Sequence, residues 1–298
     1  LHPYNKISEV QRKFMTTVKS GNVFNLGIKG SFDDCQNIIK KIFSDDYYKK
    51  SNYLTAINSI NWSRIMCQMV YYFYTMSRLE TNGKKVLFSV PTGNFGDILA
   101  GYISTKMGLK IDMFNIATNE NDILTRTLMS GKHELRKVKE TSSPSIDIQI
   151  SSNFERLLYD ITKNTDYVNN LMAELKETGK YTLEEKELSK MRETFCSYSV
   201  SEKEAGEIIK ETFRKYGIIV DPHTAVGLVS ANKCEKKYDL QVTLSTAHPA
   251  KFKDTVFDLI DNEKFITDKV HNIMKLEEDM IILDNSSDAV KTFIMENI

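Results

Sequence analysis

The residues whose types and spacing best suit chemistry lie in a glycine-containing turn at 92–97, with the sequence Thr-Gly-Asn-Phe-Gly-Asp. β-Prone residues at 86–90 precede the turn and end at a proline, and a small-residue amphipathic pattern follows it. The sequence therefore predicts a buried strand, a tight turn and a helix. Because glycines let a backbone approach an anion closely, and the amides of a helix's first turn attract negative charge, we expect this turn to bind a phosphate. The same pattern also occurs as an ordinary connection in doubly wound sheets.

A second group of polar residues, Asn58, Ser59 and Arg64, surrounds the start of a helix predicted from Trp62 to about Leu79. An amide, a hydroxyl and a guanidinium in one small volume suit a phosphate or a carboxylate, because a guanidinium binds either anion through two hydrogen bonds. The alternative is that the amides only form a turn and that Arg64 is a solvated surface charge.

A third candidate stands at the end of the last predicted sheet strand, residues 241–246. Thr246 would lie at the carboxyl end of this strand, with Ser245 beside it, and ligands of open α/β sheets gather at that edge. His223, beside the start of a predicted helix, could be a general base, but a lone histidine in that place is more often structural. We interpret His248 as shaping a turn.

Residues 92–101 resemble the cofactor-phosphate turn of the threonine synthases, which are pyridoxal 5'-phosphate (PLP) enzymes of the tryptophan-synthase β superfamily. The resemblance is to the longer bacterial and fungal branch of that family. Four further segments resemble the family in the same order along the chain: residues 30–36, 58–64, 117–122 and 246–252. Together these segments cover nearly the whole chain.

The resemblance implies the site residues and the reaction. The turn would bind the phosphate of PLP and a threonine would contact its ring nitrogen, which assigns the cofactor to Gly93, Asn94, Phe95, Gly96, Asp97 and Thr246. Asn58, Ser59 and Arg64 would bind the phosphate of the substrate, and residues 148–154 resemble a segment that helps to close the active site. The implied reaction converts O-phospho-L-homoserine and water into L-threonine and phosphate, the last step of threonine biosynthesis.

The Schiff-base lysine, which binds PLP covalently, belongs in this family to a Phe-Lys-Asp sequence that would precede Leu1. The Phe-Lys-Asp at 252–254 follows the Thr-Ala-His-Pro segment, where the family begins an ordinary helix, so we do not assign this role to Lys253. We therefore expect the chain to be the C-terminal part of a longer protein and to be inactive alone. Two alternatives remain open: a related PLP phospho-lyase that releases a 2-oxo acid, and a non-catalytic fragment that keeps the fold.

An α/β fold is needed to position these residues. A second strand, predicted at 111–118, follows the central strand and its helix at a spacing of about twenty-five residues, which is typical of a right-handed βαβ crossover. The sequence therefore predicts a doubly wound, mostly parallel sheet. The resemblance implies the PLP fold type II, with its N-terminal part missing.

We predict two domains. Residues 1–53 would end a smaller α/β domain, and residues 54–298 would form the large PLP-binding domain. A charged helical insertion is expected at about 155–216, because lysine and glutamate dominate there and apolar residues such as Leu188, Met191 and Phe195 recur at helical spacing.

Two local predictions concern the segment before the central turn. A short strand is expected at 54–61, and it leads into the helix that begins at Trp62. Within that helix, the predicted buried stripe is Met66, Val70, Phe73 and Met76, because these residues recur at helical spacing.

Composition limits the class of protein. The 298 residues carry forty basic and forty acidic side chains, so no net field favours nucleic acid or an acidic membrane, and a small-molecule partner is expected. The longest apolar run, near 66–76, is far shorter than the roughly twenty residues of a membrane span. Four cysteines lie far apart without a metal-ligand spacing, which indicates neither a metal site nor a disulfide framework. We expect a cytoplasmic monomer or homodimer.

Overall fold

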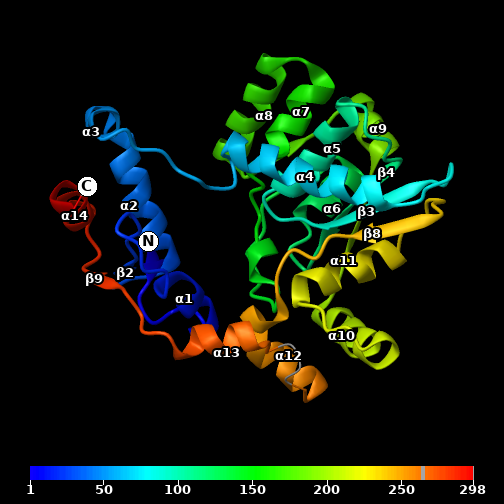
Figure 1. Ribbon diagram of the computed structural model, residues 1–298. Coiled ribbons are helices and arrows are strands. Elements are labelled where there is room, and N and C mark those ends of the chain that lie inside the picture. Colours follow the sequence, from blue (N-terminus) through cyan, green and yellow to red (C-terminus); the bar gives the residue numbers. More distant parts are fainter. Residues whose placement is uncertain (263–265, 298) are drawn as a thin grey trace. The chain divides into compact units, whose positions relative to one another are not determined.

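The computed structural model describes residues 1–262 and 266–297, and the chain divides into two compact units. One unit comprises Leu1–Ala56, Ala250–Lys253 and Asn262–Ile298, and the other comprises Ile57–Pro249 and Asp254–Asp261. Figure 1 shows the elements of both units, coloured along the chain. Among the described residues, no helix combines the length and the apolar character that crossing a membrane requires.

The first unit is a small α/β layer built from both ends of the chain. Its three strands are all parallel, in the order β1 (His2–Pro3), β2 (Leu26–Ile28) and β9 (Ile281–Leu283). Helix α2 (Phe32–Ser44) begins with a capping box in which Ser31 and Asp34 bond each other's backbone amides. The remaining helices are α1 (Glu9–Thr16), α3 (Asp46–Ser51), α13 (Asp268–Lys275) and α14 (Ser287–Asn297).

The pairing of β9 with β2 divides the chain differently from the prediction, which assigned all of residues 54–298 to one large domain. Residues near the C-terminus fold with the N-terminal residues, and Val290 and Phe293 complete a core with Ile28, Cys35 and Ile38. Strands from distant segments pair through backbone hydrogen bonds, which do not depend on the side chains. A three-residue apolar strand such as Ile281–Leu283 is therefore too short for its sequence to predict which strand it pairs with.

The second unit holds the main sheet, whose four strands are all parallel. Their order is β7 (Phe195–Ser199), β4 (Met113–Thr118), β3 (Val86–Pro91) and β8 (Leu240–Thr243). Every residue of β3 is buried, as expected for a central strand of a parallel sheet covered on both faces. Figure 1 shows α4 (Trp62–Arg78) and α5 (Gly96–Lys106) on one side of this sheet, and α10 (Glu202–Tyr216) and α11 (Pro222–Asn232) on the other. The predicted α/β fold with a mostly parallel sheet is confirmed.

The segment predicted as a helical insertion does contain several helices, but it also supplies strand β7 of the main sheet. Phe195 opens this strand and is buried. Phe195 continues the helical spacing of Leu188 and Met191. A prediction based on that spacing therefore places Phe195 in a helix, whereas the helix ends before it and a strand begins. The elements between β4 and β8 not yet described are α6 (Ile123–Ser130), β5 (Lys132–Glu134), η1 (Pro144–Ile146), α7 (Phe154–Thr162), α8 (Thr165–Thr178), β6 (Lys180–Thr182) and α9 (Glu185–Thr194).

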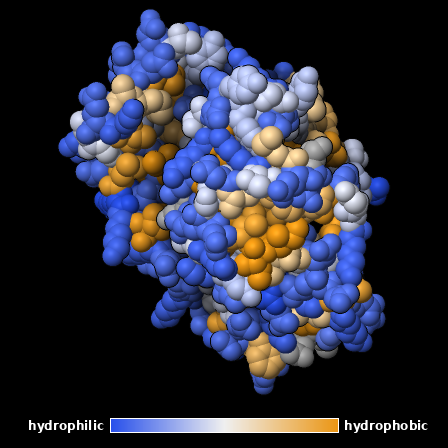
Figure 2. Space-filling model, turned by 90° about the vertical axis from the view of Figure 1, so that its left-hand side faces the viewer, coloured by the Kyte–Doolittle hydropathy of each residue, from blue (hydrophilic) through white to orange (hydrophobic). Residues whose placement is uncertain are grey.

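Helix α4 has the predicted length, but its predicted buried stripe is wrong at Met66, Val70 and Phe73, and only Met76 of that stripe packs against the core. Met66 and Val70 are 53% and 61% exposed, whereas Ile65, Met69 and Tyr72 form the buried face. The helix is apolar on both faces, so helical spacing alone could not tell which face the sheet would cover. Apolar side chains also reach the surface in several other patches (Figure 2). The strand predicted at 54–61 is also wrong, because these residues form no strand.

The contact between α4 and α5 depends on Gly101. A Cβ atom at this position would lie 2.5 Å from Cε1 of Tyr72 and 2.6 Å from Cε1 of Phe114, and both rings are fully buried. We expect Gly101→Ala to lower the free energy of unfolding by about 1–3 kcal/mol, because the buried rings must shift to admit the methyl group. Urea denaturation would measure this change.

Gly21→Ala is the matched control, because a Cβ atom there meets nothing within 4 Å. Equal unfolding midpoints for the two variants would contradict the close approach of α5 to Tyr72 and Phe114.

Candidate functional site

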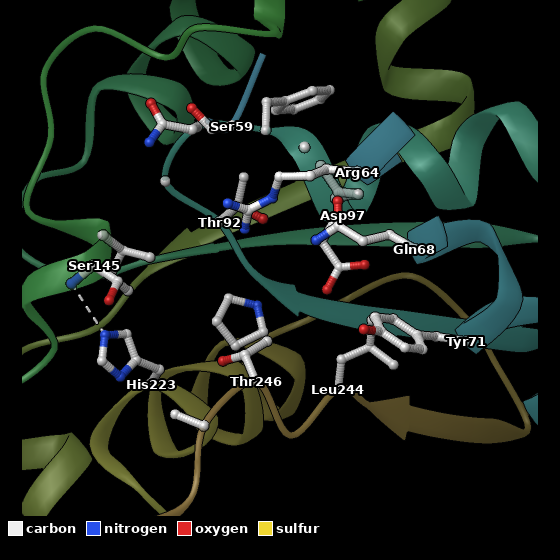
Figure 3. A pocket seen from close by; sticks show the side chains of 18 of the residues that line it. Ser59, Arg64, Gln68, Tyr71, Thr92, Asp97, Ser145, His223, Leu244 and Thr246 are labelled. Atoms are coloured by element: carbon white, nitrogen blue, oxygen red, sulfur yellow. Dashed lines mark hydrogen bonds between the residues drawn. The ribbon is translucent and has the colours of Figure 1, made fainter. Parts of the chain in front are cut away.

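The second unit contains a cavity of about 520 Å³ at the carboxyl end of the main sheet. Figure 3 shows side chains from five separate segments of the chain converging on this space, which are residues 59–71, 91–98, 145–146, 223 and 244–247. The lining residues are Ser59, Arg64, Gln68, Tyr71, Pro91, Thr92, Gly93, Asn94, Phe95, Gly96, Asp97, Ile98, Ser145, Ile146, His223, Leu244, Ser245, Thr246 and Ala247. Almost all of the predicted site residues are therefore brought together.

The turn between β3 and α5 is shaped to accept an anion. Phe95 is the N-cap of α5, adopts the left-handed conformation with φ = 60°, and provides no side-chain hydrogen bond to the helix. The first amides of α5 are therefore left without a side-chain cap at the cavity wall. At Gly93, a Cβ atom would lie only 2.7 Å from the carbonyl oxygen of Ser145, so only glycine allows this packing. The backbone geometry suits a bound phosphate.

Residues 151–153 join this turn to the turn before α4. The Ser151 hydroxyl donates to the carbonyl oxygen of Gly93 at 2.7 Å. The Nδ2 atom of Asn153, a fully buried residue, donates to the carbonyl oxygens of Asn94 at 2.7 Å and Ser59 at 2.9 Å. One amide thus fixes the spacing of the two turns that the sequence analysis assigned to two different phosphates.

Ser152 makes a parallel set of contacts between the same two turns. Its hydroxyl donates to Oδ1 of Asn94 at 3.1 Å, and it lies 3.1 Å from the hydroxyl of Ser59. From the sequence alone, neither Ser152 nor Asn153 is predicted to have a role of its own. The only signal was the resemblance of residues 148–154 to a segment that closes the family's active site.

The second turn brings two of its three predicted residues to the cavity. Ser59 and Arg64 line the cavity, and Nη1 of Arg64 donates to the carbonyl oxygen of Ile57 at 3.4 Å. Asn58 is exposed, is not among the lining residues, and uses Oδ1 to accept the amide of Ile60 at 3.2 Å. The position of Asn58 therefore fits the alternative given above, in which this amide forms the turn and does not contact a ligand.

Thr246 lines the cavity, as do its neighbours Leu244, Ser245 and Ala247. Strand β8 ends at Thr243, three residues earlier than predicted, so Thr246 stands in the segment that leaves the strand. Thr246 nevertheless lines the same cavity as Gly93. An aromatic ring that bound its phosphate at the turn and its ring nitrogen at a threonine would require this arrangement.

His223 is held by hydrogen bonds on both ring nitrogens. Its Nδ1 lies 3.0 Å from Oδ1 of the buried Asp221, and we assign the proton to Nδ1 because Nε2 accepts the backbone amide of Ser145 at 3.1 Å. Figure 3 marks the latter bond with a dashed line. Since Ser145 packs on Gly93, His223 supports the anion-binding turn through Ser145 while itself lining the cavity, and the structural interpretation of this residue fits the geometry.

The carboxyl of Asp97 has an unusual environment. Burial raises the pKa of Asp97 to about 7, against the smaller opposing effect of the Tyr72 hydroxyl, which donates to Oδ1 at 3.3 Å and to the Asp97 carbonyl oxygen at 2.9 Å. A carboxyl that is substantially protonated near neutral pH repels a phosphate less than a carboxylate would. Among the described residues, no group of three or more His, Cys, Asp or Glu side chains could hold a metal ion.

The raised pKa of Asp97 predicts a pH-dependent stability. The folded-state pKa of about 7 exceeds the ordinary value of 3.8, so the stabilising effect of the protonated carboxyl is present below pH 4 and is lost as pH rises through 7. In Asp97→Asn the side chain does not ionise, so we expect the free energy of unfolding to lose this pH dependence. The expected size is about 1.4 kcal/mol for each unit by which folding raises the pKa of Asp97. Chemical denaturation at pH 5 and pH 8 would measure the difference, and parallel pH profiles for the two proteins would contradict the assignment.

The two hydrogen bonds of Asn153 lead to a second prediction about stability. Asn153→Ala leaves the carbonyl oxygens of Asn94 and Ser59 without their donor, so we expect a loss of about 1–3 kcal/mol in the free energy of unfolding. Amide exchange should also become faster in both turns together. Asn169→Ala, at an exposed position in α8, is the control. Faster exchange in only one turn would show that Asn153 does not join them.

The chain is similar to known proteins both in sequence and in structure. A family model described as "Threonine synthase, C-terminal" matches residues 224–294. The threonine synthase of Pseudomonas aeruginosa is 41% identical over 300 residues, covering all of this chain and 64% of that protein. The threonine synthase of Saccharomyces cerevisiae is 46% identical and covers 86% of this chain and 54% of that protein.

Solved structures agree with the sequence comparison. The PLP-bound threonine synthase from Brucella melitensis has a TM-score of 0.94 and 42% identity, covering 99% of this chain and 64% of that one. The yeast threonine synthase has a TM-score of 0.90 and 40% identity, with coverages of 99% and 63%. The chain therefore spans slightly less than two thirds of the length of these relatives.

Proposed function

Because the chain belongs to the threonine synthase family and corresponds to its C-terminal part, we propose that the protein it forms is a PLP-dependent lyase that acts on O-phospho-L-homoserine. The products are L-threonine and phosphate. One observation carries the proposal: a single cavity joins an uncapped helix N-terminus at a glycine turn, a guanidinium on the neighbouring helix and a threonine beyond the end of β8. Two sites for phosphate and one for a polar ring atom are what this reaction needs.

The residues present fit PLP. The cavity of about 520 Å³ lies within the usual size range of sites for small ligands. The turn from Gly93 to Asp97 would hold the cofactor phosphate through backbone amides, and Thr246 would place its hydroxyl against the ring nitrogen. PLP supplies the electron sink of the reaction when it is bound. A neutral hydroxyl at Thr246 would not hold a proton on the ring nitrogen as firmly as a carboxylate would.

Arg64 and Ser59 would bind the phosphate of the substrate. A guanidinium and a hydroxyl can together donate several hydrogen bonds to one phosphate, and the bonds from the guanidinium are charge-assisted. Asn58 would act by shaping the turn that presents Ser59. Asn153 would keep the distance between the two phosphate sites constant, which suits a substrate whose phosphate leaves from a fixed point relative to the cofactor.

The Schiff-base lysine is proposed to come from the part of the family's sequence that this chain does not match. Among the residues that the structure describes, no lysine lines the cavity. We therefore infer that this chain alone binds the phosphate groups but does not catalyse the reaction. Reduction with borohydride in the presence of PLP should attach the cofactor to no specific lysine of this chain, and specific labelling of Lys253 would contradict this assignment.

The reaction is tested on the longer protein that contains this chain. With PLP and O-phospho-L-homoserine, we expect release of phosphate and L-threonine in equal amounts, measured by a phosphate assay and by amino-acid chromatography. Release of phosphate with a 2-oxo acid would identify the phospho-lyase instead. Absence of phosphate release in the PLP-loaded protein would contradict both reactions.

Arg64 provides a direct test of the substrate site. In the longer protein, Arg64→Ala should lower kcat/KM for O-phospho-L-homoserine by about two orders of magnitude, since charge-assisted hydrogen bonds worth about 3 kcal/mol are lost. The PLP absorption spectrum should not change. Arg78→Ala is the control, because Arg78 lies on the same helix with its guanidinium over the Tyr74 ring. A similar loss in both variants would contradict the proposed role.

A further inference from the structure

Two of the four cysteines meet on the α11 side of the main sheet, outside the cavity. Cys196 lies in β7 and is buried, whereas Cys234 follows the end of α11 and is partly exposed. Their Sγ atoms are 3.2 Å apart, although the two residues are 38 positions apart in sequence. We propose that Cys196 and Cys234 form an oxidisable dithiol, a modification site that closes to an intramolecular disulfide. This proposal does not depend on the proposed function.

The surroundings of the two sulfur atoms favour a closed pair. Cys196 packs with Leu87 and Ala231 in a small apolar cluster separate from the main core, with Tyr198 and Tyr238 at its edge. A disulfide brings its sulfur atoms to about 2.0 Å, so they need to approach by only about 1 Å. A displacement of this size is within reach of side-chain rotation and a small movement of the segment after α11.

Two hydrogen bonds hold the segment that carries Cys234 in place. The amide of Glu235 donates to the Tyr198 hydroxyl at 3.2 Å, and the Tyr238 hydroxyl donates to the carbonyl oxygen of Ala231 at 3.3 Å. Because Tyr198 belongs to β7, the first of these bonds connects the strand directly to the residue after Cys234, and the second ties the segment to the end of α11. The thiols therefore meet as a consequence of the fold, and oxidation does not require partial unfolding.

The two thiols are not equivalent, which determines the order of reaction. Burial raises the pKa of Cys196, and its thiol lies 3.6 Å from Oδ1 of Asn115, to which it can donate. Cys234 is the more accessible sulfur, so it would react first with a low-molecular-weight disulfide such as oxidised glutathione. Its thiolate attacks one sulfur of the oxidant, forming a mixed disulfide and releasing one reduced thiol.

The second step closes the protein disulfide. Cys196 loses its proton to solvent, and its thiolate attacks Sγ of Cys234, which breaks the mixed disulfide and releases the second reduced thiol. Two protein thiols are thereby oxidised and one small disulfide is reduced to two thiols, so atoms and electrons balance. The ammonium of Lys236 only partly offsets the effect of burial on the pKa of Cys196, which makes this second step the slower one.

The other two cysteines do not offer the same chemistry. Cys67 is exposed on α4, and Cys35 is buried in the core of the first unit. In the part of the chain that the structure describes, neither of them contacts a second cysteine sulfur. They serve as internal controls, an accessible lone thiol and a buried lone thiol.

The cross-link would connect the end of α11 to the sheet. It closes a loop that contains α10 and α11, and closure of such a loop restricts the unfolded chain. Helix α11 carries Asp221 and His223 at its opposite end, where His223 supports the turn at Gly93. The oxidised form would therefore keep the helix that backs the cavity attached at both ends.

The experiment uses the folded chain and oxidised glutathione. After native oxidation, free thiols are blocked with a maleimide and the protein is digested without reductant. We expect a linked peptide pair containing Cys196 and Cys234, with the loss of two hydrogen atoms, while Cys35 remains reduced. Cys67→Ser should leave the yield of the linked pair unchanged. Cys196→Ser should instead accumulate the glutathione adduct at Cys234.

Three results would overturn the proposal. They are a Cys234 that stays a free thiol under native conditions, a glutathione adduct at Cys234 that persists in the unmodified protein, and a disulfide between two copies of the chain. Circular dichroism of Cys196→Ser and Cys234→Ser would verify that each variant is folded before oxidation, and Cys196→Ala is the second variant if serine is not tolerated in the apolar cluster.

Discussion

The structure of the candidate site depends on one constraint, which is that the chain must turn from β3 into α5 without a side chain capping the helix. Phe95 adopts a left-handed conformation and Gly93 packs directly on the Ser145 carbonyl, so the amides at the start of α5 face the cavity. A capping serine or aspartate would satisfy those amides internally and leave no donor for an anion. The polar residues around the cavity are arranged to hold this turn in place.

The support comes from segments far apart in sequence. Ser151 and Asn153 hold the turn from one side, and His223 holds Ser145 from another. Asn153 also extends the same support to Ser59, so the two turns behave as parts of one structure. This arrangement explains why buried polar side chains gather here: Ser151, Asn153 and His223 each bond a backbone group in or beside the two turns, and a rigid backbone is what preorganises an anion site.

Helix α4 presents Ile65 and Tyr72 to the core, but its opposite face is also apolar and remains exposed at Met66 and Val70. The chain spans between 54% and 64% of the length of the threonine synthases compared above. Sequence resemblance identified that family correctly, because five motifs along the chain agreed with it.

The sequence by itself determined the parallel α/β fold, the turn at 93–97, the family and the three segments that meet at the cavity, because glycine placement, apolar runs and local motifs carry those properties. Only the tertiary structure decided that Phe195 opens a strand, that β9 pairs with β2, that α4 buries Tyr72, and that Asn153 joins the two turns. Periodicity shows that a face is apolar but not what covers it. Hydrogen bonds between residues 94 positions apart exist only once the chain has folded.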